Sequence, residues 1–255
     1  MDSRRFRYSL LAPLLKNYRY KLRMLDEREA WLADGYAYDH IRSSSCVSEE
    51  TPAIFVPVLK AANTAIKHLL TGERPSNSSL DIHNKPTEFG LINLWRYGLT
   101  PDDLVAGKRP CFTAVRHPVS RFWSAYSHLC SKEPQSLLAN AVRQHCGLSS
   151  EQAVKPEHLL VYIEEVPQEA REPHTRPQWA LSGHRRIPFE LIGRVENLEG
   201  FVREAVGRGL LPPAAEGRLE PHNQSQKSAG ASGGNPLDDR IANCYEEDFQ
   251  CFGYR

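Results

Sequence analysis

The chain has 255 residues, of which 40% are hydrophobic and 25% are charged, and this composition is typical of a soluble globular protein. Its 32 lysines and arginines nearly balance its 31 aspartates and glutamates, so the formal net charge is +1. This balance argues against a nucleic-acid-binding protein or any other general polyanion binder. An anion-binding site in this chain must therefore be local.

The six cysteines lie far apart and include no C-x-x-C pair. This spacing indicates neither a metal site nor a dense disulfide framework, so we expect reduced thiols, a cytoplasmic location and no bound metal. No stretch approaches about 18 apolar residues, and the N-terminal segment lacks the continuous apolar core of a secretory signal. We therefore expect no membrane span, and nothing in the composition specifies an oligomeric state.

The N-terminal part of the chain predicts a helical arm. Residues 4–33 show apolar residues recurring among charges, with Pro13 positioned to kink or split the helix. Residues 43–52 form a polar connector. The predicted organisation is thus an arm over residues 1–52 and one domain over residues 53–255.

Three strand-to-helix units follow in order. Residues 53–58 are a short apolar, β-rich run, and apolar residues between positions 62 and 70 then recur at helical spacing. Residues 111–115 predict a second strand, and Pro118 is well placed as the first residue of the next helix. Residues 189–193 predict a third strand, also followed by a helical stripe. This alternation predicts an α/β fold with a parallel sheet covered on both faces.

The segments around these units are mainly helical. Residues 136–165 predict a helical stretch between the second and third units. Residues 225–234 are rich in glycine and serine, which is typical of a loop. The last helix is predicted to start with Asn235 as its cap and Pro236 in its first position.

The first predicted anion site lies between the first strand and its helix. Helix N-termini present unpaired backbone N–H groups that bind phosphate. Small residues at Ala61 and Ala62 allow close approach, while Lys60 adds a cation and Thr64 a hydroxyl. The segment contains no glycine and is not a Walker A loop. Taken alone, the segment is better explained as an ordinary helix start with solvent-exposed Lys60 and Thr64.

The second predicted anion site begins at the end of the second strand. Arg116 lies at the strand end, and Arg121 and Ser124 are expected on the polar face of the following helix. Two guanidinium groups and a hydroxyl near a helix N-terminus suit a second phosphate. The alternative is a surface arginine paired with a carboxylate.

These segments carry a resemblance to a known family. Residues 60–64 are similar to P-K-x-G/A-x-T/S, and residues 116–126 to R-x-P-x-x-R-x-x-S-x-Y. Residues 189–198 are similar to D-F-I-G-x-x-E-x-L, and residues 245–254 to Y-x-x-D-F-x-x-F-G-Y. All four segments occur in the order in which they occur in the carbohydrate sulfotransferases of the membrane-associated type. The chain therefore resembles this family, as a soluble member of bacterial type.

The resemblance implies a fold and an activity. The fold would be a P-loop-NTPase-like three-layer α/β sandwich with a central parallel sheet flanked by helices. The activity would be transfer of a sulfuryl group from 3'-phosphoadenosine 5'-phosphosulfate (PAPS) to a hydroxyl of a carbohydrate or glycoconjugate, without a metal.

The resemblance also implies roles for particular residues. Lys60 would be catalytic and would stabilise the leaving phosphate. The other donor-binding residues would be Ala62, Asn63 and Thr64 at the 5'-phosphate, Arg116, Arg121 and Ser124 at the 3'-phosphate, and Asn223 and Ser225 in a loop that closes over the nucleotide. The Gly/Ser stretch after that loop fits a lid and a simple connector equally well.

His174 is the predicted general base, because an imidazole has a pKa near neutrality and its segment resembles H-W-x-P-Q. Thr175 replaces the tryptophan of that pattern. The alternative is a loop histidine that only contacts the acceptor or the backbone. Glu172 and His83 are the other candidates for the base.

The chain departs from the family pattern at several positions. Leu59 replaces the proline beside the lysine, Ala62 stands where glycine is usual, and His117 replaces a frequent aspartate. The cysteines common in secretory-pathway relatives are missing near residues 181–183, which fits a cytoplasmic enzyme.

Two other functions are compatible with phosphate-binding junctions. A P-loop-like kinase would need a Walker lysine–serine pair and a magnesium-binding carboxylate, and neither is found. A nucleotide- or glycan-binding module without catalysis would not need Lys60 at the transferring bond. The acceptor pocket is expected from residues 1–50, 75–105 and 130–188, because loops of this kind carry specificity.

Overall fold

The structure is a computed structural model that describes residues 23–71, 81–218 and 235–255. Within these residues one mixed sheet has the strand order β3-β1-β2-β4-β5. The strands are β1 (Cys46–Ser48), β2 (Ile54–Phe55), β3 (Leu91–Asn93), β4 (Cys111–Val115) and β5 (Phe189–Arg194).

One half of the sheet is parallel, as expected. β2 pairs with β4 and β4 pairs with β5, and the Phe55↔Phe112 and Ala114↔Gly193 registers place the three strands side by side. The pairing continues past β2, where the Val56 N–H donates to the Phe112 carbonyl at 2.9 Å. The α/β class and the three predicted strands are therefore confirmed.

The other half corrects the expectation of a parallel sheet. β1 runs antiparallel to both β2 and β3. β1 lies within residues 43–52, which were expected to be a polar connector, yet Cys46, Val47 and Ser48 are all buried. Only residues 49–53 separate β1 from β2, and a link this short permits antiparallel pairing but no parallel crossover.

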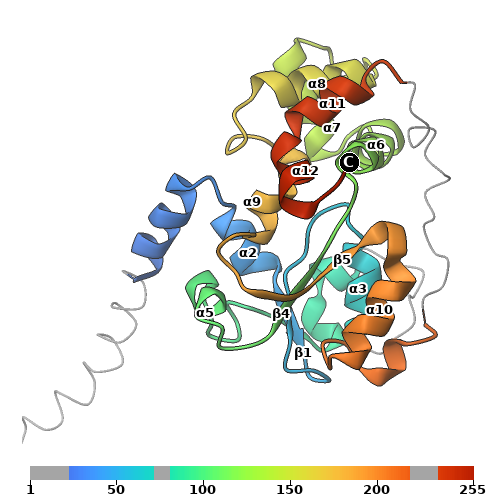
Figure 1. The fold of residues 1–255 in the computed structure, drawn as a ribbon. Helices are drawn as coiled ribbons and strands as arrows, with labels where there is room; N and C mark the ends of the chain where they lie inside the picture. Colours follow the sequence, from blue (N-terminus) through green and yellow to red (C-terminus); the bar gives the residue numbers. More distant parts are fainter. Residues whose placement is uncertain (1–22, 72–80, 219–234) are drawn as a thin grey trace, which may run out of the picture.

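Helices cover both faces of the sheet (Figure 1). Side chains alternate along a strand, so Phe55 and Phe112 pack on one face while Ile54 and Cys111 pack on the other. The first face is covered by α3 (Asn63–Thr71) and α10 (Leu198–Gly207), and the second by α2 (Tyr38–Ser44), α5 (Pro101–Val105), α9 (Gln178–Ser182) and α12 (Glu246–Phe252).

A helical cluster with its own core lies beyond the carboxyl ends of the parallel strands (Figure 1). It contains α6 (Pro118–Ala125), α7 (Leu137–Cys146), α8 (Pro156–Glu165) and α11 (Asp238–Cys244), and α6 continues into a π-helical segment, η2 (Tyr126–Lys132). The predicted helical stretch 136–165 is thus two helices, because Gly147 ends α7 in a left-handed conformation and Pro156 starts α8.

The ends of the described chain differ in part from expectation. Residues 23–33 are helical, within the predicted range 4–33, and the rest of that range lies outside the described residues. Trp31 is fully buried, and its Nε1 donates to Oδ1 of Asp102 on α5 at 2.7 Å. The described part of the arm thus packs on the domain, and the division at residues 52 and 53 stays a prediction.

Short elements complete the described chain. They are α4 (Asp81–Asn84), η1 (Pro86–Phe89), η3 (Pro173–Thr175), η4 (Val195–Asn197) and η5 (Pro213–Ala215). The last two helices are α11 and α12, and α11 begins at Asp238 instead of Pro236, because the Asn235 side chain accepts the Leu237 N–H in a turn that precedes the helix.

We predict that Gly193→Ala destabilises the fold by about 1–3 kcal/mol, because overpacking displaces neighbouring groups. A Cβ at Gly193 in β5 would lie 2.1 Å from the ring of Phe201 on α10. Gly207→Ala is the matched control, since a Cβ there meets nothing within 4 Å. Urea denaturation measures both. Equal midpoints for the two variants would contradict the packing argument.

Candidate functional site

The two predicted anion sites lie at the same edge of the sheet. β2 and β4 are parallel neighbours, so the loops that leave their carboxyl ends emerge side by side. A direct contact joins them, because Nε of Arg121 on α6 donates to the Leu59 carbonyl at 2.9 Å. The structure therefore brings the Lys60 segment and the Arg116 segment together.

The loop before α3 has an unusual backbone. Lys60 and Ala62 have φ values of 66° and 56°, in the left-handed region that disfavours side chains. Turns of this kind point successive N–H groups toward a common side and form anion-binding concavities. α3 then begins at Asn63, whose buried Oδ1 has no hydrogen-bond partner among the described residues.

Lys60 lies in a positively charged setting. The side chain is partly buried, and burial together with the nearby Arg116 and Arg121 lowers the pKa of Lys60 to about 8, although Glu133 acts in the opposite direction. An ammonium group held beside two guanidinium groups favours binding of an anion, which would relieve their mutual repulsion.

Thr64 is the end of a hydrogen-bonded chain. Its Oγ1 lies 2.8 Å from Nε2 of His83, and Nδ1 of His83 lies 3.4 Å from the ammonium of the buried Lys67. Burial lowers the pKa of His83 to about 4, so the imidazole is neutral. Because the Lys67 ammonium can only donate, His83 donates to Thr64, whose own hydrogen is then directed elsewhere. Both ring nitrogens of His83 are engaged, which disfavours it as the base.

Arg116 is held through its backbone at the end of β4. Its N–H donates to Oε1 of Gln178 at 2.9 Å, and its carbonyl accepts from Nε2 of the same side chain at 2.7 Å. Burial lowers the pKa of Arg116, while Glu196 and Tyr254 oppose that shift. Ser124 lies on α6, partly exposed.

Arg121 is placed differently from Arg116. It is only 2% exposed, its Nε donates to the Leu59 carbonyl, and its Nη2 donates to the His174 carbonyl at 3.2 Å. Its guanidinium therefore lies between two loops, in place of the polar helix surface that the sequence indicates. Its role as a ligand of the 3'-phosphate stays a prediction.

His174 forms a pair with a carboxylate two residues away. Its Nδ1 lies 2.8 Å from Oε1 of Glu172, and its backbone N–H donates to Oε2 of the same group at 2.8 Å. An ionised Glu172 accepts from Nδ1–H, which leaves Nε2 of His174 as the basic nitrogen. The His174 side chain is 29% exposed and that of Glu172 is 12% exposed. The arrangement disfavours Glu172 as the base, because both of its oxygens are occupied.

The C-terminal segment anchors the loop that carries His174. The hydroxyl of Tyr245 donates to the Thr175 carbonyl at 2.8 Å. The buried carboxylate of Asp248 accepts the N–H groups of Gln178 and Trp179, each at 2.9 Å. Sequence reasoning assigned no role to these residues, although Tyr245 and Asp248 belong to the closing motif of the family resemblance and Gln178 is the last residue of its H-W-x-P-Q segment.

His117 is held by a second group of C-terminal contacts. Its N–H donates to Oε1 of Glu196 at 2.7 Å, and Oε2 of Glu196 accepts from the Tyr254 hydroxyl at 3.0 Å. The His117 ring packs edge-on against Phe249 and Tyr254, with centroids 5.2 and 5.3 Å away. The imidazole that replaces the usual aspartate thus fills an aromatic pocket.

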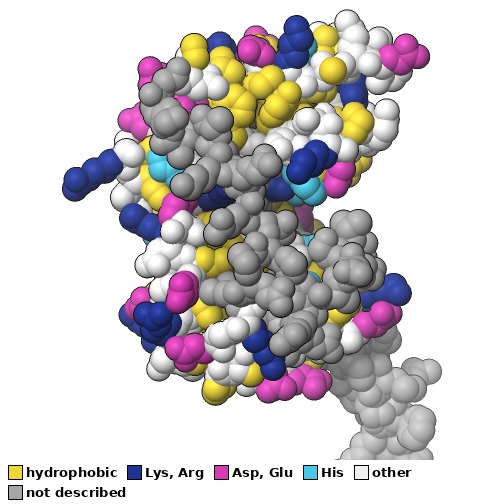
Figure 2. Space-filling view, turned by 90° about the vertical axis from the view of Figure 1, so that its right-hand side faces the viewer, with side chains coloured by type: hydrophobic (Ala, Val, Ile, Leu, Met, Phe, Trp, Pro, Cys, Tyr) yellow, Lys and Arg dark blue, Asp and Glu magenta, His cyan; other side chains and the backbone are white. Residues whose placement is uncertain are grey.

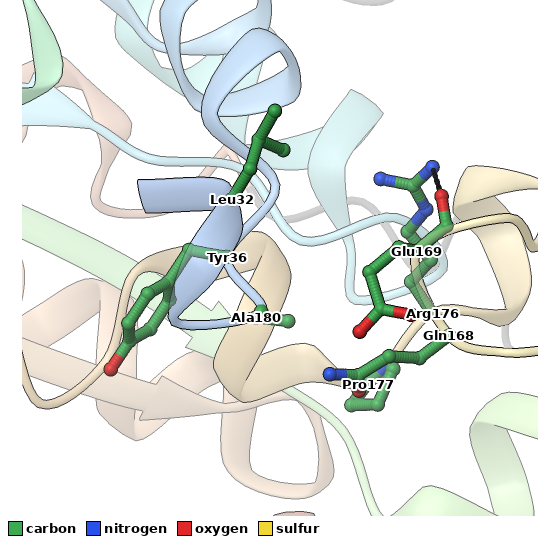
Figure 3. Close-up of a pocket in the computed structure, with 8 residues that line it drawn as sticks. Leu32, Tyr36, Gln168, Glu169, Arg176, Pro177 and Ala180 are labelled. Atoms are coloured by element: carbon green, nitrogen blue, oxygen red, sulfur yellow. Dashed lines mark hydrogen bonds between the residues drawn. The ribbon is translucent and has the colours of Figure 1, made fainter. Parts of the chain in front are cut away.

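The surface around the site is partly visible. Figure 2 shows Lys/Arg and His side chains close together at the level between the helical cluster and the sheet. A small hollow, partly open to solvent, lies between residues 32–36 and residues 168–180 (Figure 3). Arg176 lines it but donates to the carbonyls of Glu169 and Arg171, so this guanidinium is engaged within its own loop. Asn223 and Ser225 lie outside the described residues.

Membrane spans and metal clusters are both absent from residues 23–71, 81–218 and 235–255. No helix in these ranges is long and apolar enough to cross a bilayer. No group of three or more His, Cys, Asp or Glu side chains in the same ranges is arranged to hold a metal ion.

A comparison with known protein families agrees with this geometry. The model of the sulfotransferase family matches residues 45–255, which is most of the chain. The chain belongs to the sulfotransferase family, and the family resemblance of the sequence is confirmed at this level. No curated protein and no solved structure matches the chain.

We predict that Ala62→Gly leaves the free energy of unfolding unchanged or raises it, because glycine relieves a left-handed strain of about 1 kcal/mol. Ala61→Gly is the matched control, since Ala61 is fully buried and does not have a positive φ. That variant is expected to lose about 1 kcal/mol or more. Denaturant unfolding measures both, and an equal loss for the two would refute the strain at Ala62.

Proposed function

We propose that this sulfotransferase uses PAPS as donor and sulfates a hydroxyl of a carbohydrate or glycoconjugate. The family match supports sulfuryl transfer. The observation that carries the donor assignment is the adjacency of two strand-to-helix junctions, one with Lys60 and the other with Arg116. A doubly phosphorylated nucleotide needs two such sites side by side.

The residues at the first junction fit a 5'-phosphosulfate. The left-handed turn at Lys60 and Ala62 offers backbone N–H groups, and α3 begins at Asn63. Thr64 is able to donate, because His83 already donates to it. The architecture at β2 and α3 is in this sense P-loop-like, without the Walker glycines.

The second junction fits a 3'-phosphate. Arg116 supplies a guanidinium from a residue whose backbone is fixed by Gln178, and Ser124 supplies a hydroxyl from α6. A guanidinium matches phosphate geometry with two parallel hydrogen bonds. Asn223 and Ser225 complete the proposed donor site from outside the described residues.

The reaction is an in-line displacement at sulfur. The acceptor oxygen forms a bond to sulfur as the bond from sulfur to the 5'-phosphate oxygen breaks, and Lys60 stabilises the negative charge that develops on that oxygen. His174 Nε2 takes the acceptor's proton, and Glu172 stabilises the imidazolium. The products are a sulfated acceptor and adenosine 3',5'-bisphosphate.

The pairing of His174 with Glu172 favours catalysis over binding alone. An imidazole whose tautomer is fixed by a carboxylate is the arrangement of a general base, and a module that only binds nucleotide has no use for it. The hollow in Figure 3 lies within two of the segments expected to form the acceptor pocket. All six cysteines are free thiols, which supports the proposed cytoplasmic location.

The test of the function is Lys60→Ala, assayed by transfer of labelled sulfate from PAPS to a panel of acceptors. Loss of one charge-stabilising donor is expected to lower kcat by about 100- to 1000-fold, with little change in thermal stability. Arg203→Ala is the control, because it removes one exposed positive charge from α10. Full transfer by the Lys60 variant would exclude the mechanism. Magnesium-dependent hydrolysis of ATP would favour a kinase instead.

We also predict that adenosine 3',5'-bisphosphate binds more weakly as the pH rises above about 8, where free Lys60 loses its proton. A bound anion favours the ammonium form, so binding takes up a proton in this range. The dissociation constant is expected to rise by up to about tenfold per pH unit. In Lys60→Arg the side chain stays charged in this pH range, so the dependence of the dissociation constant on pH is expected to vanish. Calorimetry at several pH values measures it, and identical slopes in both proteins would contradict the assignment.

A further inference from the structure

The side chain of Arg121 is buried between two loops of the candidate site. It belongs to α6, yet its guanidinium reaches two segments that are far apart in the sequence. Nε donates to the carbonyl of Leu59, the residue before Lys60, and Nη2 donates to the carbonyl of His174. The contact points are thus at or beside both residues proposed to act on the sulfuryl group and its acceptor.

A guanidinium is suited to fix the separation of two acceptors. Its planar fork has a rigid geometry, and less freedom is lost per hydrogen bond than with a flexible ammonium. At 2% exposure, solvent does not compete for these donors. The position of the Leu59 carbonyl relative to the His174 carbonyl is therefore set by one side chain.

The surroundings of Arg121 support the same role. Burial lowers its pKa, while Tyr245, Asp248 and Glu172 act in the opposite direction. Two of these groups themselves hold the His174 loop, since Tyr245 donates to the Thr175 carbonyl and Asp248 accepts the N–H groups at the start of α9. The groups that oppose the effect of burial on the pKa of Arg121 therefore include two that anchor the His174 loop.

The backbone conformation of the Lys60 loop depends on support from neighbouring residues. Lys60 itself has a φ of 66°, and a residue in this region persists only where its surroundings enforce the conformation. The hydrogen bond from Arg121 reaches the carbonyl directly before it.

We propose that Arg121 is a positioning residue that joins the Lys60 loop to the His174 loop and fixes the separation of the two catalytic groups. It differs from Arg116, which is proposed to bind the 3'-phosphate, and it replaces the sequence-based expectation that Arg121 does so too. The inference rests on the proposed function for its effect on catalysis, but the link between the loops has a readout of its own.

The kinetic test compares Arg121→Met and Arg121→Lys with Arg143→Met. Arg143 is a matched control, because it is 5% exposed and also donates to loop carbonyls, those of Gln152 and Pro134. Misplacement of a catalytic group by about 1 Å lowers rates by about 100-fold, so kcat of Arg121→Met is expected to fall by about 30- to 100-fold. We expect a smaller loss for Arg121→Lys, and a kcat within about twofold of the wild type for Arg143→Met.

The binding test separates positioning from phosphate binding. The ratio of dissociation constants for adenosine 5'-phosphate and adenosine 3',5'-bisphosphate reports contacts to the 3'-phosphate. This ratio is expected to change by less than about threefold in the Arg121 variants and to collapse toward one in Arg116→Ala. The inference would be overturned if this ratio fell toward one in Arg121→Met while kcat at saturating PAPS stayed unchanged.

Amide hydrogen exchange tests the link without any activity. Arg121→Met is expected to accelerate exchange at least about tenfold in residues 59–62 and 173–176, whereas Arg143→Met leaves both loops unchanged. Unchanged protection in both loops of Arg121→Met would overturn the inference. If the wild type neither binds the bisphosphate nor transfers sulfate, the proposed function fails, and hydrogen exchange alone still decides whether Arg121 joins the loops.

Discussion

The parallel pairing of β2 with β4 is the constraint on which the site depends. The Phe55↔Phe112 register brings both strands to one edge, so the loops before α3 and α6 begin side by side whatever their side chains are. Each loop leads into a helix N-terminus, and the backbone alone thus provides two neighbouring groups of N–H donors. Lys60 and Arg116 then add positive charge to a geometry that the topology has already created.

The rest of the site is assembled from distant segments by hydrogen bonds to backbone. Gln178 holds both backbone groups of Arg116, Asp248 holds the start of α9, and Tyr245 holds the residue after His174. Buried polar groups of this kind are costly when one partner is removed, so the network ties the C-terminal segment to the site. The network also reaches the hollow, because Thr175 and Gln178 flank two of the residues that line it, Arg176 and Pro177.

Local sequence patterns predicted the parallel strands and the helices after them, because an apolar run followed by a helical stripe is a property of one segment. β1 and β3 escaped prediction, since strands of three residues show no usable periodicity and their pairing joins residues as far apart as Cys46 and Asn93. Lys60 and Arg116 could be singled out because a strand end followed by a helix start can be recognised in sequence, and the structure brings their two loops together. The burial of Arg121 was not predicted, because its helical spacing is that of a polar face and only tertiary packing brings Leu59 and His174 over it. Gln178 and Asp248 lie in segments of the family resemblance, but a motif does not show that their side chains bind backbone atoms of distant segments.

Glu172 and His174 are separated by a single residue and lie in the same short turn. A shift of that turn would carry imidazole and carboxylate together, so the hydrogen bond that fixes the tautomer of the ring is a local property. The direction in which the ring points is a separate property, because it depends on the contacts that hold the turn against the rest of the protein. A change in those contacts could thus turn the histidine in a new direction without breaking its hydrogen bond to Glu172.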